Sequence, residues 1–553
     1  MSNNKVKIIL PAVGAAVIAV GAVTAYLYLK GGPSGTISDA VGSAKLVPDE
    51  ALVATYISTD PKTWSKLKEF GTPEAQKLLE KGISSFNKDL EKDNMSYEKD
   101  IKPWIGGVMI AVLPSNPTQK VQNLSKRKPQ PDMLMVIGVK DKLAALDFSN
   151  KLKSQKNSKT KEINYKDEKI IESINKKGSP SYVSLLNDRL VFAPKKVTIE
   201  KAIDTYKGKP SLASKESARD LFQKKINLQN TLLQVYVPNY YETIQKLGTL
   251  NSAAPLPPTT LKQLKSLKAM VFGIGVDDAG IRMKAIANIE SQSNNFQPQE
   301  TSSNVINALP VNTIASINGK GLKNVWSSIV KQSQDYPELG QVLEQMRQQT
   351  QTLNLNLDKD VFSWMDGEFT IAAVPGEKGI LANTGFGGAL ILDTSDRKTT
   401  EATLSKLNNI AQKQAPFKIG KTNINGKEVT QWSVPGQGTL VNHGWLDNDT
   451  VFLAVGDPVA KSIISPQGSL KESDNFKAIA GSLEQPNTGY FYMDMDQTMK
   501  IVNRFTPTQS FPPEARAILS SIRGLAISGR NLDGNTSEAE LLLALRRNTT
   551  AKK

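Results

Sequence analysis

The sequence predicts an α+β protein: an N-terminal transmembrane helix followed by two tandem homologous repeats of mostly antiparallel sheet with packed helices. Three observations lead to this fold class. They are an uncharged apolar run near the N-terminus, a series of segments that recur in the same order, and short strand patterns joined by hairpin-type turns. Hairpins imply antiparallel pairing, whereas a doubly wound α/β fold requires parallel strands joined by helices.

The first predicted element is a membrane anchor over residues 1–30. The run from Ile8 to Leu29 has 22 residues and no charge, which as a helix spans about 33 Å and exceeds a hydrocarbon core of about 30 Å. Lys5 and Lys7 precede the run and favour a cytoplasmic N-terminus. We therefore expect a single-pass protein whose bulk is extracytoplasmic and which contacts the bilayer through residues 8–29. A cleaved secretory signal is the alternative.

Residues 31–44 are small, polar and rich in glycine, which predicts a flexible tether.

The body of the chain then shows internal repetition. Asp100–Gly107 and Asp360–Gly367 both read D-x-x-x-W-x-x-G, 260 residues apart, and both lead into an apolar strand pattern. Further matches keep the same order. They predict repeat 1 at 45–290, a polar linker at 291–306, repeat 2 at 307–547 and a tail at 548–553.

Each repeat mixes strand and helix patterns. In repeat 1 we expect strands at 52–57, 108–113, 133–139, 182–186, 189–193, 232–237 and 270–276, and helices at 61–92, 141–156, 196–206, 215–226 and 240–250. The dipeptide Asn425-Gly426 between two strand patterns is a strong hairpin signal. Asn187-Asp188 and Asp533-Gly534 are weaker signals of the same kind.

Composition excludes several function classes. The chain has no cysteine and one histidine, His443. Disulfides, zinc fingers, iron–sulfur clusters, cysteine nucleophiles and HExxH metalloproteases are therefore impossible.

The net charge of +16 lies almost entirely in one repeat. Residues 45–290 carry 41 basic and 27 acidic residues, whereas residues 307–547 carry 23 and 24. Lysine dominates in repeat 1, which disfavours nucleic-acid recognition, usually an arginine function. Repeat 1 is expected either to contact anionic lipid or an acidic protein, or to be a solvated surface without a specific target. The protein partner, if there is one, is unknown.

Four features resemble functional sites, and each has a structural interpretation that we prefer. Trp104 and Trp364 of the repeated motif are expected to pack between strand and helix, with the motif glycine in a turn. The glycine-rich stretch Gly376–Gly388 precedes a strand, whereas a phosphate-binding loop opens a helix. Asp494 and Asp496 would share one face of a strand and could hold a divalent cation, but a strand end entering solvent is the simpler explanation. His443 lacks a G-x-S-x-G companion, so a surface or hairpin histidine is expected.

The stretches Leu46-Val-Pro48-Asp-Glu-Ala-Leu and Lys-Pro-Trp104-Ile-Gly-Gly resemble an uncharacterised family of single-span, membrane-anchored cyanobacterial proteins, defined by a domain of unknown function. The resemblance covers most of the chain after residue 45. It implies an extracytoplasmic protein of the periplasm or thylakoid lumen and brings no catalytic residues. Ser363-Trp364-Met-Asp departs from the pattern of the first copy.

The functional expectation is a non-enzymatic, membrane-anchored interaction or scaffold protein. We expect no catalytic residues, no bound cofactor and no metal site. Two alternatives stay open: an ectodomain that binds an apolar ligand or lipid, and a hydrolase of unknown substrate that uses His443 or the Asp494/Asp496 pair.

Overall fold

The computed structural model describes residues 40–78, 80–81, 95–114, 132–154, 159–174, 178–216, 226–250, 264–290, 298–334, 336–414 and 417–548. The chain divides into two compact units. Unit 1 contains residues up to 68, 77–277 and 284–289, and unit 2 contains residues 69–76, 278–283 and everything from 290 onward. The predicted anchor over residues 1–30 and most of the predicted tether lie outside the described residues.

Unit 1 is an antiparallel sheet with helices on both faces. In sheet order its strands are β10 (Gly280–Ile289), β9 (Leu267–Val276), β8 (Thr231–Val237), β1 (Val53–Ile57), β2 (Ile105–Leu113), β3 (Asp132–Val139), β7 (Arg189–Ala193), β6 (Pro180–Leu186), β5 (Glu168–Ile174) and β4 (Lys159–Tyr165). Of β10, residues 284–289 belong to unit 1. Its helices are α2 (Ala40–Ala44), α3 (Pro61–Ser65), α5 (Lys142–Ser154), α6 (Lys196–Tyr206) and α8 (Tyr240–Leu250).

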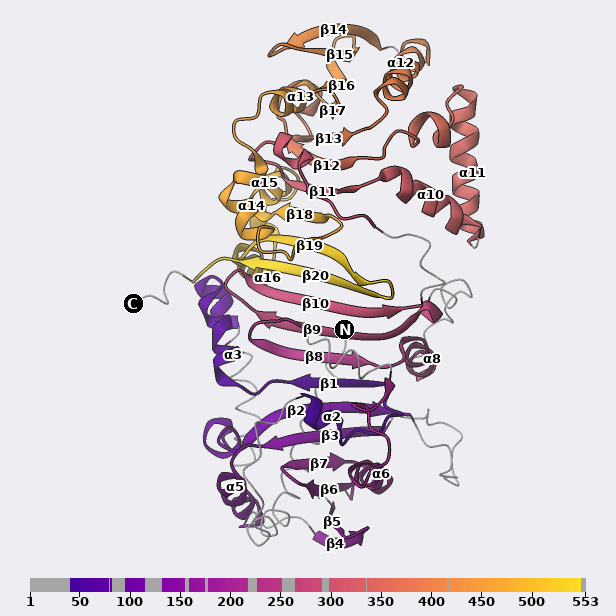
Figure 1. The fold of residues 1–553 in the computed structure, drawn as a ribbon. Coiled ribbons are helices and arrows are strands. Elements are labelled where there is room, and N and C mark those ends of the chain that lie inside the picture. The colour runs from indigo at the N-terminus through magenta and orange to yellow at the C-terminus, as the bar shows by residue number, and fades with distance from the viewer. Residues whose placement is uncertain are drawn as a thin grey trace. The chain divides into compact units, whose positions relative to one another are not determined.

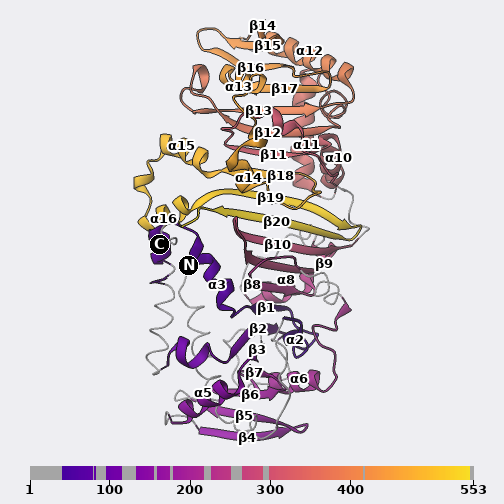
Figure 2. The same ribbon diagram turned by 60° about the vertical axis from the view of Figure 1, so that its left-hand side comes forward.

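Two hydrophobic cores fill unit 1, because the strands alternate apolar residues between the two sheet faces. Ile199 and Ile203 of α6 pack with Met109 of β2 in one core. Phe148 of α5 packs with Met135 of β3 in the other. Accordingly, α5 and α6 lie on opposite sides of the strands in both views (Figures 1 and 2).

Unit 2 has the same strand order. Its strands are β20 (Thr536–Leu545), β19 (Ile522–Asp533), β18 (Tyr490–Asp494), β11 (Ala315–Lys320), β12 (Glu368–Pro375), β13 (Phe386–Asp393), β17 (Thr450–Val455), β16 (Gly438–Trp445), β15 (Lys427–Val434) and β14 (Lys418–Ile424). Its helices are α10 (Leu322–Ser333), α11 (Pro337–Thr352), α12 (Arg397–Gln414), α13 (Asp457–Ile464), α14 (Asp474–Ile479), α15 (Met495–Phe505) and α16 (Pro513–Ser521).

Helices cover the two faces of this sheet unequally. Val459 of α13 and Phe476 of α14 pack with Tyr492 and Ala372 in a large core on one face. On the other face, Leu404 of α12 packs with the far ends of the central strands. α13 and α14 therefore lie on one side of the strands, and α10, α11 and α12 on the other (Figure 1).

The predicted fold class is wrong. Among the described residues, no helix is both long and apolar enough to cross a membrane. In place of an architecture that starts with a transmembrane helix, the described residues of each unit form a mostly antiparallel sheet with packed helices. The physical reason is that its apolar residues occur in short alternating segments, which form strands. The longest helix among the described residues, α12, carries charges along its length.

Turn chemistry explains where hairpins close. Asn425 and Gly426 adopt φ values of 49° and 82° between β14 and β15, as the asparagine–glycine signal predicts. Asn187 joins β6 to β7 with a φ of 59°. Lys166 and Asp167 close the β4–β5 hairpin with φ values of 50° and 64°, and this hairpin was not predicted, because lysine is uncommon in the left-handed region.

Candidate functional site

The repeated tryptophan motif is a packed corner in each unit. Trp104 and Trp364 are buried, and each indole Nε1 donates to the carbonyl of the motif aspartate, at 2.8 Å in unit 1 and 3.0 Å in unit 2. The Asp360 carboxylate binds Lys406 at 2.7 Å, and this hydrogen bond lowers its pKa. The structural interpretation of both tryptophans is confirmed.

The expected turn conformation is wrong for Gly107, which lies inside β2, whereas Gly367 lies in a bend just before β12. A Cβ at Gly107 would overlap the ring of Tyr56, and a Cβ at Gly367 would lie 2.3 Å from the carbonyl oxygen of Asp393. Glycine is thus required by close packing at both positions.

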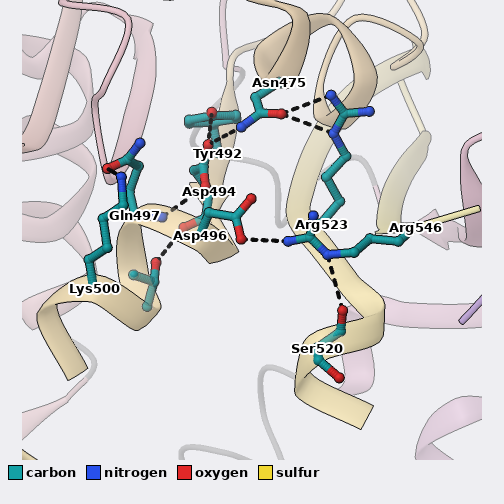
Figure 3. A network of polar contacts seen from close by, with 10 residues as sticks. Asn475, Tyr492, Asp494, Asp496, Gln497, Lys500, Ser520, Arg523 and Arg546 are labelled. Carbon is teal, nitrogen blue, oxygen red and sulfur yellow. Dashed lines mark hydrogen bonds and ion pairs between the residues drawn. The ribbon is translucent and has the colours of Figure 1, made fainter. Parts of the chain in front are cut away.

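Asp494 and Asp496 do not form a cation site. Asp494 ends β18 and caps α15, where its carboxylate accepts from Gln497 N at 3.0 Å and from Asn475 Nδ2 at 2.8 Å (Figure 3). Asp496 is the second residue of α15 and pairs with Arg546 at 2.5 Å. The prediction of a shared strand face fails because the strand ends between them. No group of three or more potential metal ligands occurs in the part of the chain that the structure describes.

The wider network around Asp494 is structural. Arg523 donates through Nε and Nη2 to Asn475 Oδ1 at 3.0 and 2.8 Å, so Asn475 links the guanidinium to the cap (Figure 3). Burial raises the pKa of Tyr492 beside the Asp494 carboxylate. Asp494, Asp496, Asn475 and Arg523 each have a hydrogen-bond or ion-pair partner in this network.

His443 is held in β16 by an amide. It is buried and donates from Nε2 to Asn408 Oδ1 at 2.8 Å, and that oxygen also accepts from Trp432 Nε1 at 2.7 Å. Burial lowers the pKa of His443 to about 4. Of the two expected positions, surface or hairpin, the structure shows the hairpin strand, with the ring buried. Its partner is neither a serine nor a carboxylate, so the geometry is not that of a hydrolytic triad.

The glycine-rich stretch Gly376–Gly388 leads into β13 and not into a helix. Arg504 donates from Nη2 to the carbonyl of Ala382 at 2.6 Å and pairs with Glu377 at 3.0 Å. The loop therefore presents a carbonyl group to a cation and does not form a cradle of N–H groups for a phosphate.

The most unusual surface in unit 2 is a line of apolar side chains across the sheet, which we call the apolar row. Its members face one another in register on neighbouring strands: Leu541, Ile527, Phe491, Ile317, Ile371, Leu390 and Leu453. Because side chains alternate along a strand, the row lies on the face opposite Tyr492 and Ala372 of the large core.

The middle of the apolar row is open to solvent. Ile317 is 49% exposed, Ile371 is 48% exposed and Ile527 is 38% exposed. Two residues further along the same strands and on the same face, the side chains are again apolar: Ala315, Ala373, Met493, Leu525 and Leu543.

Among the residues that the structure describes, helices cover one side of the row and not the other. Phe369 and Leu392, two residues from Ile371 and Leu390 in the other direction, are buried with Leu404 of α12. The row therefore begins where this helical cover ends. It forms an uncharged strip that crosses several strands.

Sequence reasoning did not identify this surface. The signal was present, since EFTIAAVP and YFYMD place apolar residues at both alternating positions of the strand. Such strands are usually buried on both faces. An uncovered second face is therefore a candidate binding surface.

The fold and the apolar row together define a mostly antiparallel sheet protein with helices and an open apolar sheet face in unit 2. By sequence, the chain belongs to the family described as Protein of unknown function (DUF3352), whose profile matches residues 12–545. This bears out the predicted domain of unknown function. The predicted cyanobacterial source and membrane anchoring receive no support from the match.

No curated protein matches the chain. Among solved structures, crystal form III of TP0453 is 13% identical with a TM-score of 0.25 and covers 45% of this chain and 79% of that one. Crystal form IV is 12% identical with a TM-score of 0.26 and covers 46% and 81%. Likenesses at this level carry no argument about fold or function.

Proposed function

We propose that the protein is a non-enzymatic binding protein and that the apolar row of unit 2 binds the hydrocarbon chain of a single lipid molecule. The observation that carries the proposal is the exposure of Ile317 and Ile371, which oppose each other on the open face. The sequence-based candidates for catalysis weigh against an enzyme, because His443 and Asp494 are held in structural hydrogen bonds.

The chemistry of the row favours a hydrocarbon chain over a protein partner. Backbone N–H and C=O groups of the central strands are used in the sheet ladder, and the side chains of the row offer no hydrogen bond. Protein interfaces normally include about one hydrogen bond per 100–200 Å². A hydrocarbon chain needs none.

The dimensions agree with this ligand. From Ile527 to Ile371 the row crosses four neighbouring strands, which at 4.7–4.9 Å per strand is about 14 Å. One acyl chain occupies half of a hydrocarbon core that is about 30 Å thick, or about 15 Å. The exposed part of the row therefore suits one extended chain.

The test is titration of the full chain with the fluorescent fatty acid cis-parinaric acid. Wild type should bind it, and the Ile317→Ser/Ile371→Ser variant should bind at least about tenfold more weakly, because each isoleucine loses about 1 kcal/mol of apolar burial in the complex. The control is Phe505→Ser/Ile518→Ser, which removes two apolar side chains of 63% and 54% exposure from helices. Equal binding by the row variant and the control would refute the proposal, as would no binding by wild type.

The location of the protein outside the cytoplasm is also a proposal and derives from the sequence. Protease protection of the full chain in its native membrane fraction tests it. The contact of lysine-rich residues 45–290 with anionic lipid or an acidic protein is a further proposal of the same origin.

A further inference from the structure

Unit 2 contains a second candidate site, a cleft of about 850 Å³ at the tip of the β14–β15 hairpin. The hairpin tip forms one wall, α13 and the chain after it form another, and the loop before β11 closes the end. Its polar lining consists of Asn312, Asn423, Asn425, Lys461, Ser462, Ser465 and Gln467. The volume is in the range of small-molecule sites.

The cleft is polar but carries little charge. No carboxylate lines it, and its ammonium group, Lys461 Nζ, pairs with Asp457 at 2.7 Å. The side-chain amides of Asn312, Asn425 and Gln467 make no hydrogen bond to the described residues. Each primary amide supplies two donors and one acceptor, so the lining offers both kinds of group to a ligand.

The walls of the cleft are fixed in place before any ligand arrives. Asn423 Oδ1 accepts from Gly426 N at 2.8 Å and holds the hairpin tip. Opposite the tip, Pro310 is buried and bridges to Ser469 in antiparallel fashion. Pre-formed walls reduce the entropy that a ligand loses on binding.

We infer that this cleft binds an uncharged, hydroxyl-rich ligand, a neutral saccharide. Hydroxyl groups both donate and accept, as primary amides do, and the paired lysine gives no reason for a charged ligand to bind. The apolar side chains of Ile424 and Pro458 in the lining suit the C–H face of a sugar ring. A peptide fits less well, because peptides are usually bound along a strand edge or in an apolar groove, whereas this cleft is formed at a hairpin tip.

The test is saturation-transfer NMR and calorimetry of the full chain with four neutral disaccharides: maltose, cellobiose, sucrose and N,N′-diacetylchitobiose. The variant is Asn425→Gly/Gln467→Ala. Glycine adopts the φ of 49° at position 425 without strain, so the hairpin keeps its turn while two amides are lost. The matched control is Asn187→Gly, which removes the asparagine at a φ of 59° in the β6–β7 hairpin of unit 1.

We expect at least one disaccharide to bind the wild type and the double variant to bind it about tenfold more weakly, since two neutral hydrogen-bonding groups are removed. The Asn187→Gly control should bind as wild type does. The inference is overturned if none of the four sugars binds wild type, or if the double variant and the control bind equally. It is also overturned if inorganic phosphate binds the cleft more tightly than every sugar. Because cis-parinaric acid binding reports only on the apolar row, failure here leaves the lipid proposal to its own test.

Discussion

The carboxylate of Glu368, at the start of β12, holds the segment that precedes the short 3₁₀ turn Val305–Ala308 in unit 2. Its Oε1 accepts from Thr301 Oγ1 at 2.7 Å, Ser302 N at 2.7 Å and Ser303 N at 3.0 Å, and its Oε2 accepts from Asn304 N at 2.6 Å. Replacing Glu368 by glutamine leaves one acceptor oxygen and presents an NH2 group to the remaining donors. We predict that Glu368→Gln destabilises unit 2.

The size of the effect follows from the donors that lose their acceptor. An unsatisfied donor costs about 1–3 kcal/mol when buried. Ser302 and Asn304 are exposed to water, so their cost lies at the low end of this range. The expected loss is about 2 kcal/mol, which shifts the midpoint of urea unfolding by about 1 M at a slope of about 2 kcal/mol/M.

The same contacts make the stability depend on pH. Burial raises the pKa of Glu368, but the hydrogen bonds from Thr301 and the backbone N–H groups outweigh burial and hold the pKa below its ordinary value. A carboxyl group whose pKa is lower in the folded state stabilises the protein above its unfolded pKa. This stabilisation is lost as the pH falls through the lower, folded value.

Urea unfolding of wild type and variant at pH 7, followed by hydrogen exchange of the amides of residues 302–304, measures the effect. The control is Glu377→Gln, whose carboxylate side chain is 73% exposed and pairs only with Arg504, so its expected cost is below about 1 kcal/mol. Equal midpoints for the two variants would refute the reasoning, as would unchanged exchange at residues 302–304.

Three further predictions concern buried groups. His443 has a pKa of about 4 in the folded protein against an ordinary 6.5, so unfolding between these pH values binds a proton. The free energy of unfolding should therefore fall by up to about 3 kcal/mol from pH 6.5 to pH 4. The urea midpoint of His443→Gln should vary less over this range, and a variant whose midpoint varies with pH as much as that of wild type would contradict the assignment. Trp364→Phe loses a buried hydrogen bond and ring volume and should lower the free energy of unfolding by about 2–3 kcal/mol. Trp64 is 44% exposed, so Trp64→Phe should lower the free energy of unfolding by less than about 1 kcal/mol. Thermal unfolding of the two variants compares these losses. Arg282→Met leaves the buried Glu540 carboxylate without its guanidinium partner and should lower the free energy of unfolding by about 3–5 kcal/mol. Adding Glu540→Leu should restore more than half of this loss, as measured by urea unfolding.

Local patterns in the sequence predicted many of the elements correctly. The helices expected at 196–206 and 240–250 match α6 and α8 to the residue, and the strand expected at 189–193 matches β7. In these segments apolar residues recur with a clear helix or strand period and a turn residue follows, so local chemistry decides their structure. β4 and β5 were missed, because EINYKDEKI has polar residues throughout and a lysine–aspartate turn.

Features that depend on distant contacts were not predictable in this way. Asp494 and Asp496 are two residues apart and would share a face in any strand, but Asp494 caps a helix through Gln497 N. That outcome depends on Asn475 and Arg523, which reach the cap from other elements. The apolar row had a sequence signal in each strand, but its exposure depends on where the covering helices end.

The equal strand order of the two units provides an internal comparison for the apolar row. Thr55 opposes Ile110 in unit 1 as Ile317 opposes Ile371 in unit 2, on equivalent strands. Ile110 packs against a hydrophobic core, whereas Ile371 is 48% exposed. The fold therefore accepts a threonine at the centre of this face, and nothing in the packing of unit 2 requires isoleucine there. An exposed apolar side chain that folding does not require is best explained by a bound molecule that covers it, so Ile317→Thr should leave the stability of unit 2 within about 1 kcal/mol of wild type while weakening the binding of cis-parinaric acid.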